Sequence, residues 1–147
     1  MQPDNVFDDF TRNISYRVFR CPEGIDLTAT MKDVFHDIFL EIIVEAGSLR
    51  ILSARVNFLK QPTDYCQQID RAMSLLVGTV IGKGLNKRLV EIFGGSEGCG
   101  NIRTMLMALL PLALNAKAAR GIKDQNEMLE KISSELTGTC IGYPLNS

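Results

Sequence analysis

Residues 14–31 read ISYRVFRCPEGIDLTATM, and they hold two alternating runs on either side of a short turn. In residues 14–20 apolar side chains stand at every second position, which is the period of a half-buried strand. Residues 25–31 repeat this period, and Cys21-Pro22-Glu23-Gly24 supplies the turn between the runs. The sequence therefore predicts an antiparallel β-hairpin.

A second pair of alternating runs follows the first. Residues 37–44 place apolar side chains on one face, and residues 49–58 are rich in β-branched and aromatic residues. Ala46-Gly47-Ser48 forms the turn between these two runs. Strands that follow one another through short turns predict an antiparallel meander, a sheet that needs cover on one face only.

The pattern changes after Pro62 from a period of two to helical spacing. The predicted helices span residues 65–77, 85–93, 102–120 with a kink near Pro111, and 127–136. A meander followed by helices that cover one of its faces is an α+β fold. We expect a single domain over residues 1–147, with a loose N-terminal segment at 1–12 and a tail at 139–147.

Composition excludes several classes of protein. The 147 residues carry 16 basic and 17 acidic side chains, a balance that favours neither a nucleic-acid nor a membrane partner. The longest apolar run, residues 105–114, is too short to cross a hydrocarbon layer of roughly 30 Å. The first ten residues lack the layout of an export signal, so we expect a cytoplasmic protein with free cysteines rather than disulfides.

Four residues at the ends of predicted elements are candidate metal ligands. His36 and Asp37 stand at the entry to the third strand, Cys66 at the start of the first helix, and Cys99 where a glycine-rich loop opens the central helix. Strand ends and helix starts can meet at one rim of such a fold. Zinc and iron accept thiolate, imidazole and carboxylate ligands together. The pattern thus suggests a site for zinc or an iron–sulfur cluster.

Other interpretations of these residues remain open. Cysteines are often buried as small apolar side chains, His36 can serve a loop, and Asp37 can be a charge at the edge of a strand. A nucleophilic pair of His36 with Cys66 or Cys99 requires the fold to bring them together. The glycine-rich loops at 82–84 and 94–100 lack the context of a phosphate-binding loop, so tight turns explain them better.

Several short motifs together resemble an uncharacterised bacterial family, domain of unknown function 2889, over about residues 14–118. The motif of that family ends Gly-Cys-Thr-His-Leu, whereas this chain reads Gly98-Cys99-Gly100-Asn101-Ile102, with asparagine in place of the histidine. The segments that carry the resemblance are His36-Asp37, Pro62 before Cys66, Leu76-Val77-Gly78, Ile81-Gly82-Lys83-Gly84, and Gly94-Gly95 leading to Gly98-Cys99.

A more distant similarity is to the U-type iron–sulfur cluster assembly scaffolds. Residues 49–56 are similar to their second strand, Asp37 corresponds to their aspartate and Cys99 to their last cysteine, while Cys66 and His36 fall near two further ligands. This resemblance implies a related fold and a non-catalytic metal or cluster site. The alternative is a protein- or small-ligand-binding domain whose cysteines are structural, and an exposed outer strand makes a homodimer a further expectation.

Overall fold

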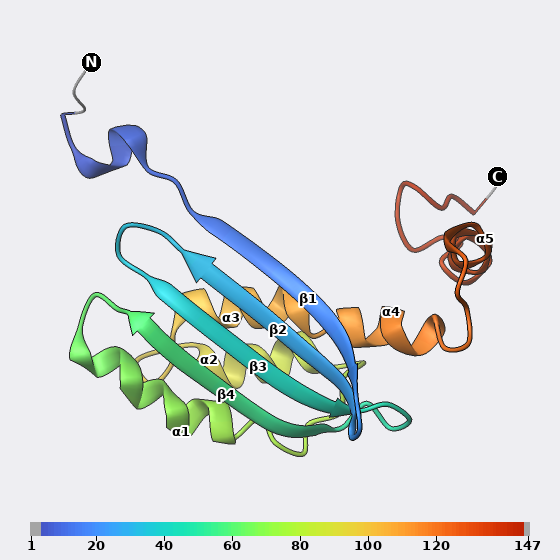
Figure 1. Ribbon diagram of the computed structural model, residues 1–147, viewed down its shortest axis with the longest axis horizontal. Coiled ribbons are helices and arrows are strands. Elements are labelled where there is room, and N and C mark those ends of the chain that lie inside the picture. The colour runs from blue at the N-terminus through green and yellow to red at the C-terminus, as the bar shows by residue number, and fades with distance from the viewer. Residues whose placement is uncertain (1–3, 146–147) are drawn as a thin grey trace. The chain divides into compact units, whose positions relative to one another are not determined.

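A computed structural model describes residues 4–145 of the chain. Its centre is a sheet in the order β1-β2-β3-β4, in which each strand pairs antiparallel with the next (Figure 1). The strands are β1 Asn13–Cys21, β2 Gly24–Lys32, β3 Asp37–Glu45 and β4 Ile51–Lys60. The predicted meander and the α+β class are confirmed.

The turn between β1 and β2 depends on one glycine. Cys21 pairs with Gly24, so only Pro22 and Glu23 lie between the strands. Gly24 has φ +148°, and a Cβ there would lie 2.5 Å from the carbonyl oxygen of Val44 and 2.6 Å from the nitrogen of Ala46. The close approach of the third strand therefore excludes every side chain at this position.

Helices α1, α2 and α3 lie behind one face of the sheet in Figure 1. The segment predicted as one helix at 65–77 begins as a 3₁₀ helix, and the helix predicted at 102–120 is broken around Pro111, because proline cannot donate the hydrogen bond that would continue it. The helical elements are η1 Val6–Asp9, η2 Asp64–Ile69, α1 Asp70–Ser74, α2 Leu85–Phe93, α3 Gly100–Leu109, α4 Leu112–Ala118 and α5 Gln125–Glu135.

The chain forms two compact units, one up to Ala116 and the other from Lys117 onward. The first holds the sheet and its helical cover. The second holds α5, whose first turn is capped by the Asp124 side chain accepting from the N–H of Glu127. The single-domain expectation stays a prediction. No helix in residues 4–145 combines the length and apolar character needed to cross a membrane.

The hydrophobic core lies between the sheet and the helices. Every second residue of β3 from Ile38 to Val44 is fully buried, whereas the intervening residues are only half-buried. This alternation shows that β3 turns one face to the helices and the other to solvent. The buried side chains that α2, α3 and the turn after α1 contribute to the same core include Leu76, Leu89, Phe93, Ile102, Met105, Leu106 and Leu109.

We predict that Leu40→Ala destabilises the protein by about 2–5 kcal/mol, because it removes a fully buried side chain from the central inner row. Leu59→Ala is the matched control, since Leu59 is 68% exposed on β4, and its cost should stay below about 0.5 kcal/mol. Urea unfolding followed by circular dichroism measures both. Equal losses would contradict the assignment of the two sheet faces.

Candidate functional site

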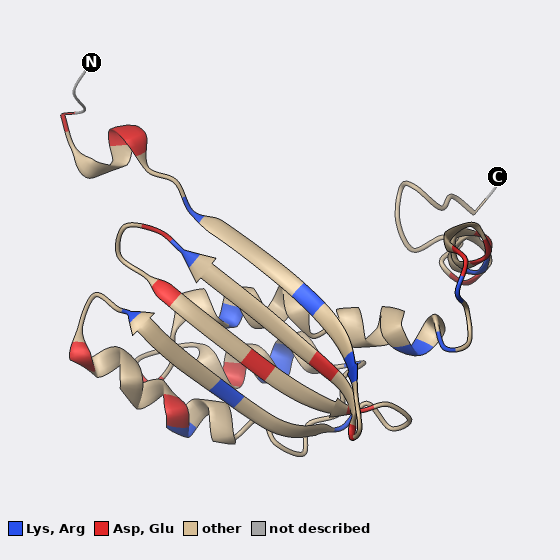
Figure 2. Cartoon of the chain, viewed as in Figure 1, with Lys and Arg blue, Asp and Glu red and all other residues tan. Residues whose placement is uncertain are grey.

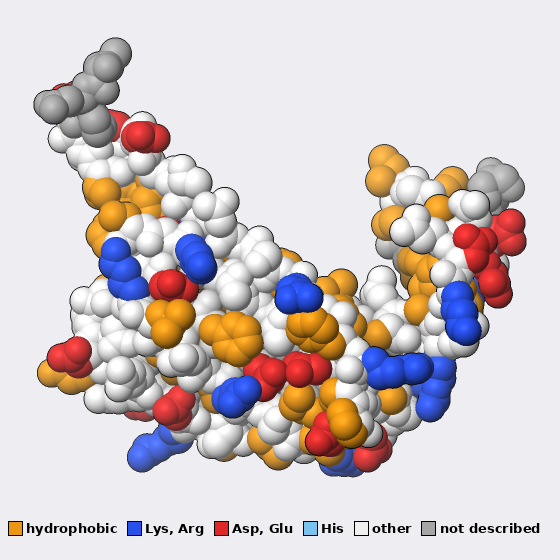
Figure 3. Space-filling model, viewed as in Figure 1, with side chains coloured by type: hydrophobic (Ala, Val, Ile, Leu, Met, Phe, Trp, Pro, Cys, Tyr) orange, Lys and Arg blue, Asp and Glu red, His pale blue; other side chains and the backbone are white. Residues whose placement is uncertain are grey.

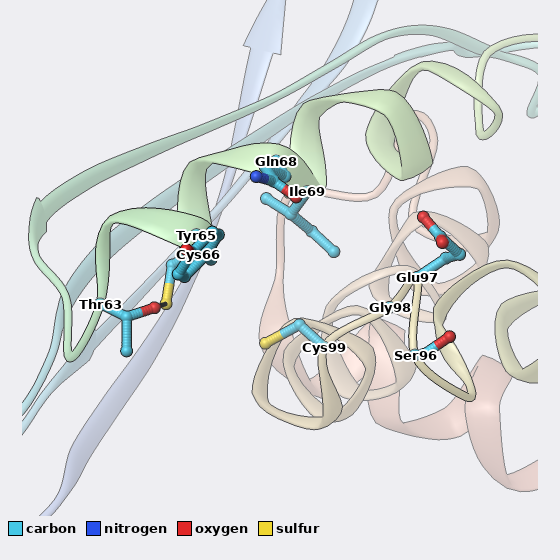
Figure 4. A pocket seen from close by; sticks show the side chains of 9 residues that line it. All are labelled: Thr63, Tyr65, Cys66, Gln68, Ile69, Ser96, Glu97, Gly98 and Cys99. Carbon is cyan, nitrogen blue, oxygen red and sulfur yellow. Dashed lines mark hydrogen bonds between the residues drawn. The ribbon is translucent and has the colours of Figure 1, made fainter.

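Both cysteines predicted as ligands line the same cavity. Its volume is about 290 Å³, and it opens between the segment at the start of η2 and the loop that leads into α3 (Figure 4). Cys66 lies on the first wall and Cys99 on the second, so residues far apart in the sequence come together here. The lining residues are Thr63, Tyr65, Cys66, Gln68, Ile69, Ser96, Glu97, Gly98 and Cys99.

A tight glycine loop sets the position of Cys99. Gly98 lies directly against the end of α2, where a Cβ would be only 1.9 Å from the carbonyl oxygen of Phe93. Gly95 has φ +79°, which glycine adopts at little cost. Cys99 then has extended backbone and is the N-cap of α3, and its half-buried side chain packs against the core. The loop is thus a steric turn that delivers a thiol to the cavity.

Cys66 lies inside η2 rather than at the start of an α-helix. Its N–H donates to the carbonyl of Thr63 at 3.3 Å, and its Sγ lies 3.8 Å from the Thr63 hydroxyl oxygen. Figure 4 shows this thiol on the opposite wall from Cys99. All four cysteines are free, as the sequence predicted.

His36 belongs to a neighbouring polar cluster, the Asp33 network, which comprises Arg12, Asp33, His36 and Asn101. The imidazole Nδ1 lies 3.0 Å from Asp33 Oδ1, and Nε2 lies 3.3 Å from Asn101 Nδ2. Arg12 Nε donates to Asp33 Oδ2 at 2.7 Å, and its Nη1 donates to Asn101 Oδ1 at 3.2 Å. The network therefore ties the turn between β2 and β3 to the first turn of α3.

Asp33 is the centre of this network, and its side chain is fully buried. Burial alone would raise the pKa of this carboxyl group. The hydrogen bonds from Arg12 and His36, and from the N–H groups of Phe35 and His36, outweigh burial and hold the pKa of Asp33 well below its usual range. Asp33 is therefore an anion that the surrounding donors stabilise.

The contacts of His36 assign roles to its two ring nitrogens. With the carboxylate of Asp33 as acceptor at one side and the amide N–H₂ of Asn101 as donor at the other, Nδ1 carries the proton and Nε2 accepts. Within residues 4–145 neither thiol of the cavity hydrogen-bonds to His36. A Cys–His nucleophilic pair thus lacks the contact that it needs.

Asp37 lies on a different face from the two thiols. It is the first residue of β3 and stands opposite Lys32 and Lys60. Because Ile38 points into the core, alternation directs Asp37 to the open face of the sheet. Across the described residues no three His, Cys, Asp or Glu side chains gather in an arrangement that could hold a metal ion. The predicted ligand set of His36, Asp37, Cys66 and Cys99 stays a prediction.

The sequence pattern did not reveal the roles of Arg12, Asp33 and Asn101. A weak signal exists for one of them, since Asp33 stands three positions before His36 in a turn, where aspartate commonly accepts backbone N–H groups. No local signal pairs Arg12 or Asn101 with this turn. Glu97, which brings a carboxylate to the lining of the cavity, was also missed.

A second titratable cluster lies on the open face of the sheet. Asp26 on β2 and Glu41 on β3 are neighbours, and Arg55 on β4 donates to Glu41 at 2.8 Å. Burial, followed by the nearby carboxyl group of Glu41, raises the pKa of Asp26 to about 6. Oδ1 of Asp26 is buried without a hydrogen-bond partner among the described residues. Figure 2 shows these opposite charges along the strands.

The fold and the cavity together define a class of protein. It is a small α+β protein whose meander is covered by helices on one face, and in which a glycine loop and η2 place two thiols on the lining of one cavity. The chain belongs to the family described as Protein of unknown function (DUF2889), whose family model matches residues 22–115. That range contains Cys66, Cys99 and Asn101, and the family expected from the motifs is confirmed. No curated protein and no solved structure gives a significant match to the chain.

We predict that Asp33→Asn lowers the free energy of unfolding by about 2 kcal/mol at pH 7, because charge-assisted bonds from Arg12 and His36 are lost. A carboxyl group whose pKa is lowered by folding stabilises the protein above its ordinary pKa and loses that effect as the pH falls. Wild type should therefore lose stability between roughly pH 5 and pH 2, and the variant less. Urea unfolding against pH measures this, with the exposed Glu23→Gln as control; parallel curves would contradict it.

For Asp26 we predict that the free energy of unfolding depends on pH in the opposite direction. Because folding raises its pKa to about 6, ionisation above that pH weakens the folded state. Asp26→Asn should raise the free energy of unfolding by about 1 kcal/mol at pH 8, because water screens part of the electrostatic cost at this half-buried position. The gain should fade toward pH 5. Thermal unfolding at a series of pH values measures it. A variant less stable than wild type at pH 8 would refute the explanation.

Proposed function

We propose that this chain is a non-catalytic thiol-site protein that binds a zinc or iron ion through Cys66 and Cys99. The observation that supports the proposal is that two free, half-buried thiols from separate elements line one cavity. Soft thiolate ligands select zinc, copper(I) and iron–sulfur centres over magnesium or calcium.

The two thiols are the ligands that the cavity offers to such an ion. Zinc in proteins takes four ligands. Glu97 belongs to the same lining, but across residues 4–145 it does not join the two thiols in a group of three that could hold a metal ion. Water would complete the coordination. The ligand set is therefore narrower than the one predicted from the sequence, because His36 is held by Asp33 and Asn101, and Asp37 starts a strand on the open face. In this proposal His36 positions the start of α3 and does not bind the ion.

The wider proposal is a distant relationship to the U-type cluster assembly scaffolds. Support comes from the order of elements, antiparallel strands followed by helices, and from thiols placed at a loop and at a helix start. The proposal includes a reducing, cytoplasmic location, which agrees with four free cysteines. It also includes a simpler site than the scaffolds have, because Cys99 lacks the histidine that precedes the last cysteine of the scaffolds.

A second candidate function is a protein- or small-ligand-binding domain whose cysteines are structural. The packing of Cys99 against the core favours it, since a thiol in that position stabilises the fold like any small apolar group. The cavity would then hold a small organic molecule or the side chain of a partner. The two candidates differ in whether the thiols or the remaining lining residues make the decisive contacts.

We predict that protein purified without oxygen contains zinc or iron at about one ion per chain, and that Cys66→Ala and Cys99→Ala each lose most of it, because a site with two thiolates cannot hold the ion with one. Cys140→Ala is the control, since Cys140 is exposed and lies outside the cavity. Elemental analysis by mass spectrometry measures the content. Absence of both metals from every preparation would refute the proposal.

Thiol labelling under native conditions separates the two candidate functions. If Cys66 and Cys99 bind metal, added zinc slows their labelling and leaves that of Cys140 unchanged. If the cysteines are structural, they label slowly with or without zinc and rapidly only after denaturation. Peptide mapping by mass spectrometry assigns each rate to its residue.

A further inference from the structure

One edge of the sheet is a long strand without a partner. β1 pairs with β2 on one side only, and no backbone group of Asn13–Cys21 bonds to any other segment in residues 4–145. The strand is nine residues long and has no proline. Val18 is 42% exposed and Phe19 36% exposed. A long, partly apolar edge of this kind is a template for another strand.

The outward groups of β1 follow from its turn. In a hairpin with a two-residue loop the closing pair, here Cys21 and Gly24, is hydrogen-bonded, and such pairs alternate along the ladder. Odd-numbered residues of β1 therefore direct their N–H and C=O groups to β2. Tyr16, Val18 and Arg20 direct theirs away from the sheet. These residues are the ones that a further strand would bond.

We infer that β1 pairs antiparallel with β1 of a second copy, in a two-fold register centred on Val18. In that register Val18 faces the partner's Val18, and Tyr16 faces the partner's Arg20, so the outward backbone groups of all three residues are paired. On the open face Arg17 stands opposite the partner's Phe19. Within one chain the Arg17 guanidinium already lies 4.3 Å from the centre of the Phe19 ring, so the contact repeats across the axis.

Two other symmetric registers place like charges opposite one another. A register centred on Arg17 sets two guanidinium groups face to face, and one centred on Tyr16 sets Arg20 against the partner's Arg12, which is already bound to Asp33. Directly opposed like charges destabilise a strand pair. A register centred on Phe19 pairs only residues 17–21 of the strand, whereas one centred on Val18 pairs residues 15–21. Charge thus excludes the registers centred on Tyr16 and Arg17. The longer overlap favours Val18 over Ser15 and Phe19. In the Val18 register the strand is complementary to a second copy of itself.

Figure 3 shows the open face that this pairing would extend into the second copy. Aromatic side chains and charges of both signs share this face: Phe19 on β1 is opposite Asp26, and Phe39 on β3 is opposite Thr30. The other edge strand, β4, differs, because α1 packs beside it and Arg50, just before it, bridges to Val80. β1 is therefore the edge that is open to a further strand, and β4 is not.

The inference is tested first by oligomeric state. Sedimentation velocity over a wide range of concentration should show wild type in a monomer–dimer equilibrium, and Val18→Lys should raise the dissociation constant at least about tenfold, because two lysines then oppose each other at the axis. Leu59→Lys on β4 is the matched control and should leave the equilibrium unchanged. Circular dichroism verifies that both variants are folded.

The register is tested by disulfide trapping. Opposed residues of an antiparallel pair have Cα atoms about 5.5 Å apart at hydrogen-bonded positions, such as Val18, and about 4.5 Å apart at the others, such as Ser15 with Cys21; both fall within the range of a disulfide. Val18→Cys should link to itself across the axis, and Ser15→Cys should link to the partner's Cys21, as peptide mapping would show. A monomer at every concentration, a dimer that Val18→Lys leaves intact, or links to other positions would overturn the inference. Metal content is independent of this result, so failure here leaves the proposed function standing.

Discussion

The structure depends on the burial of one row of side chains on β3. Ile38, Leu40, Ile42 and Val44 are fully buried, and they can all point the same way only if the strand is regular and helices cover that face. This row determines which face of the sheet is buried, and therefore on which face the helices pack. The position of the helices in turn determines which thiols share a cavity and which edge strand has no neighbouring element.

The Asp33 network joins the turn between β2 and β3, at one end of the sheet, to helix α3. Its anion sits at the turn between β2 and β3, and its donors come from the N-terminal segment, from the turn and, through His36, from α3. Without these donors, burial of the ionised carboxylate would strongly destabilise the folded state. The network thus positions the beginning of α3 and, two residues earlier in the chain, Cys99. The polar contacts of this network therefore help to set the position of the cavity wall that carries Cys99.

The strands and α2 could be predicted from the sequence because their signal is local. A period of two ending at Cys21-Pro22-Glu23-Gly24 is visible without any knowledge of the fold, and α2 spans the predicted residues. The break at Pro111 was foreseen as a kink, but proline and its neighbours separate two helices. The 3₁₀ start at Asp64–Ile69 has no period of its own that distinguishes it from an α-helix in a short segment.

The candidate site was less accessible to prediction because its contacts join distant segments. Cys66 and Cys99 could be selected as residues at element ends, and the fold does place them in one cavity. Asp37 was selected by the same rule, yet the alternation of β3 directs it to the opposite face, since a shift of one position along a strand reverses the direction of a side chain. Arg12 and Asn101 carry no local pattern at all, because only the packed structure brings an N-terminal arginine beside the first turn of α3. Sequence periodicity therefore predicts which face of a strand or helix is buried, but not which residues from distant segments come into contact. In this protein the polar network and the cavity are both built from such long-range contacts.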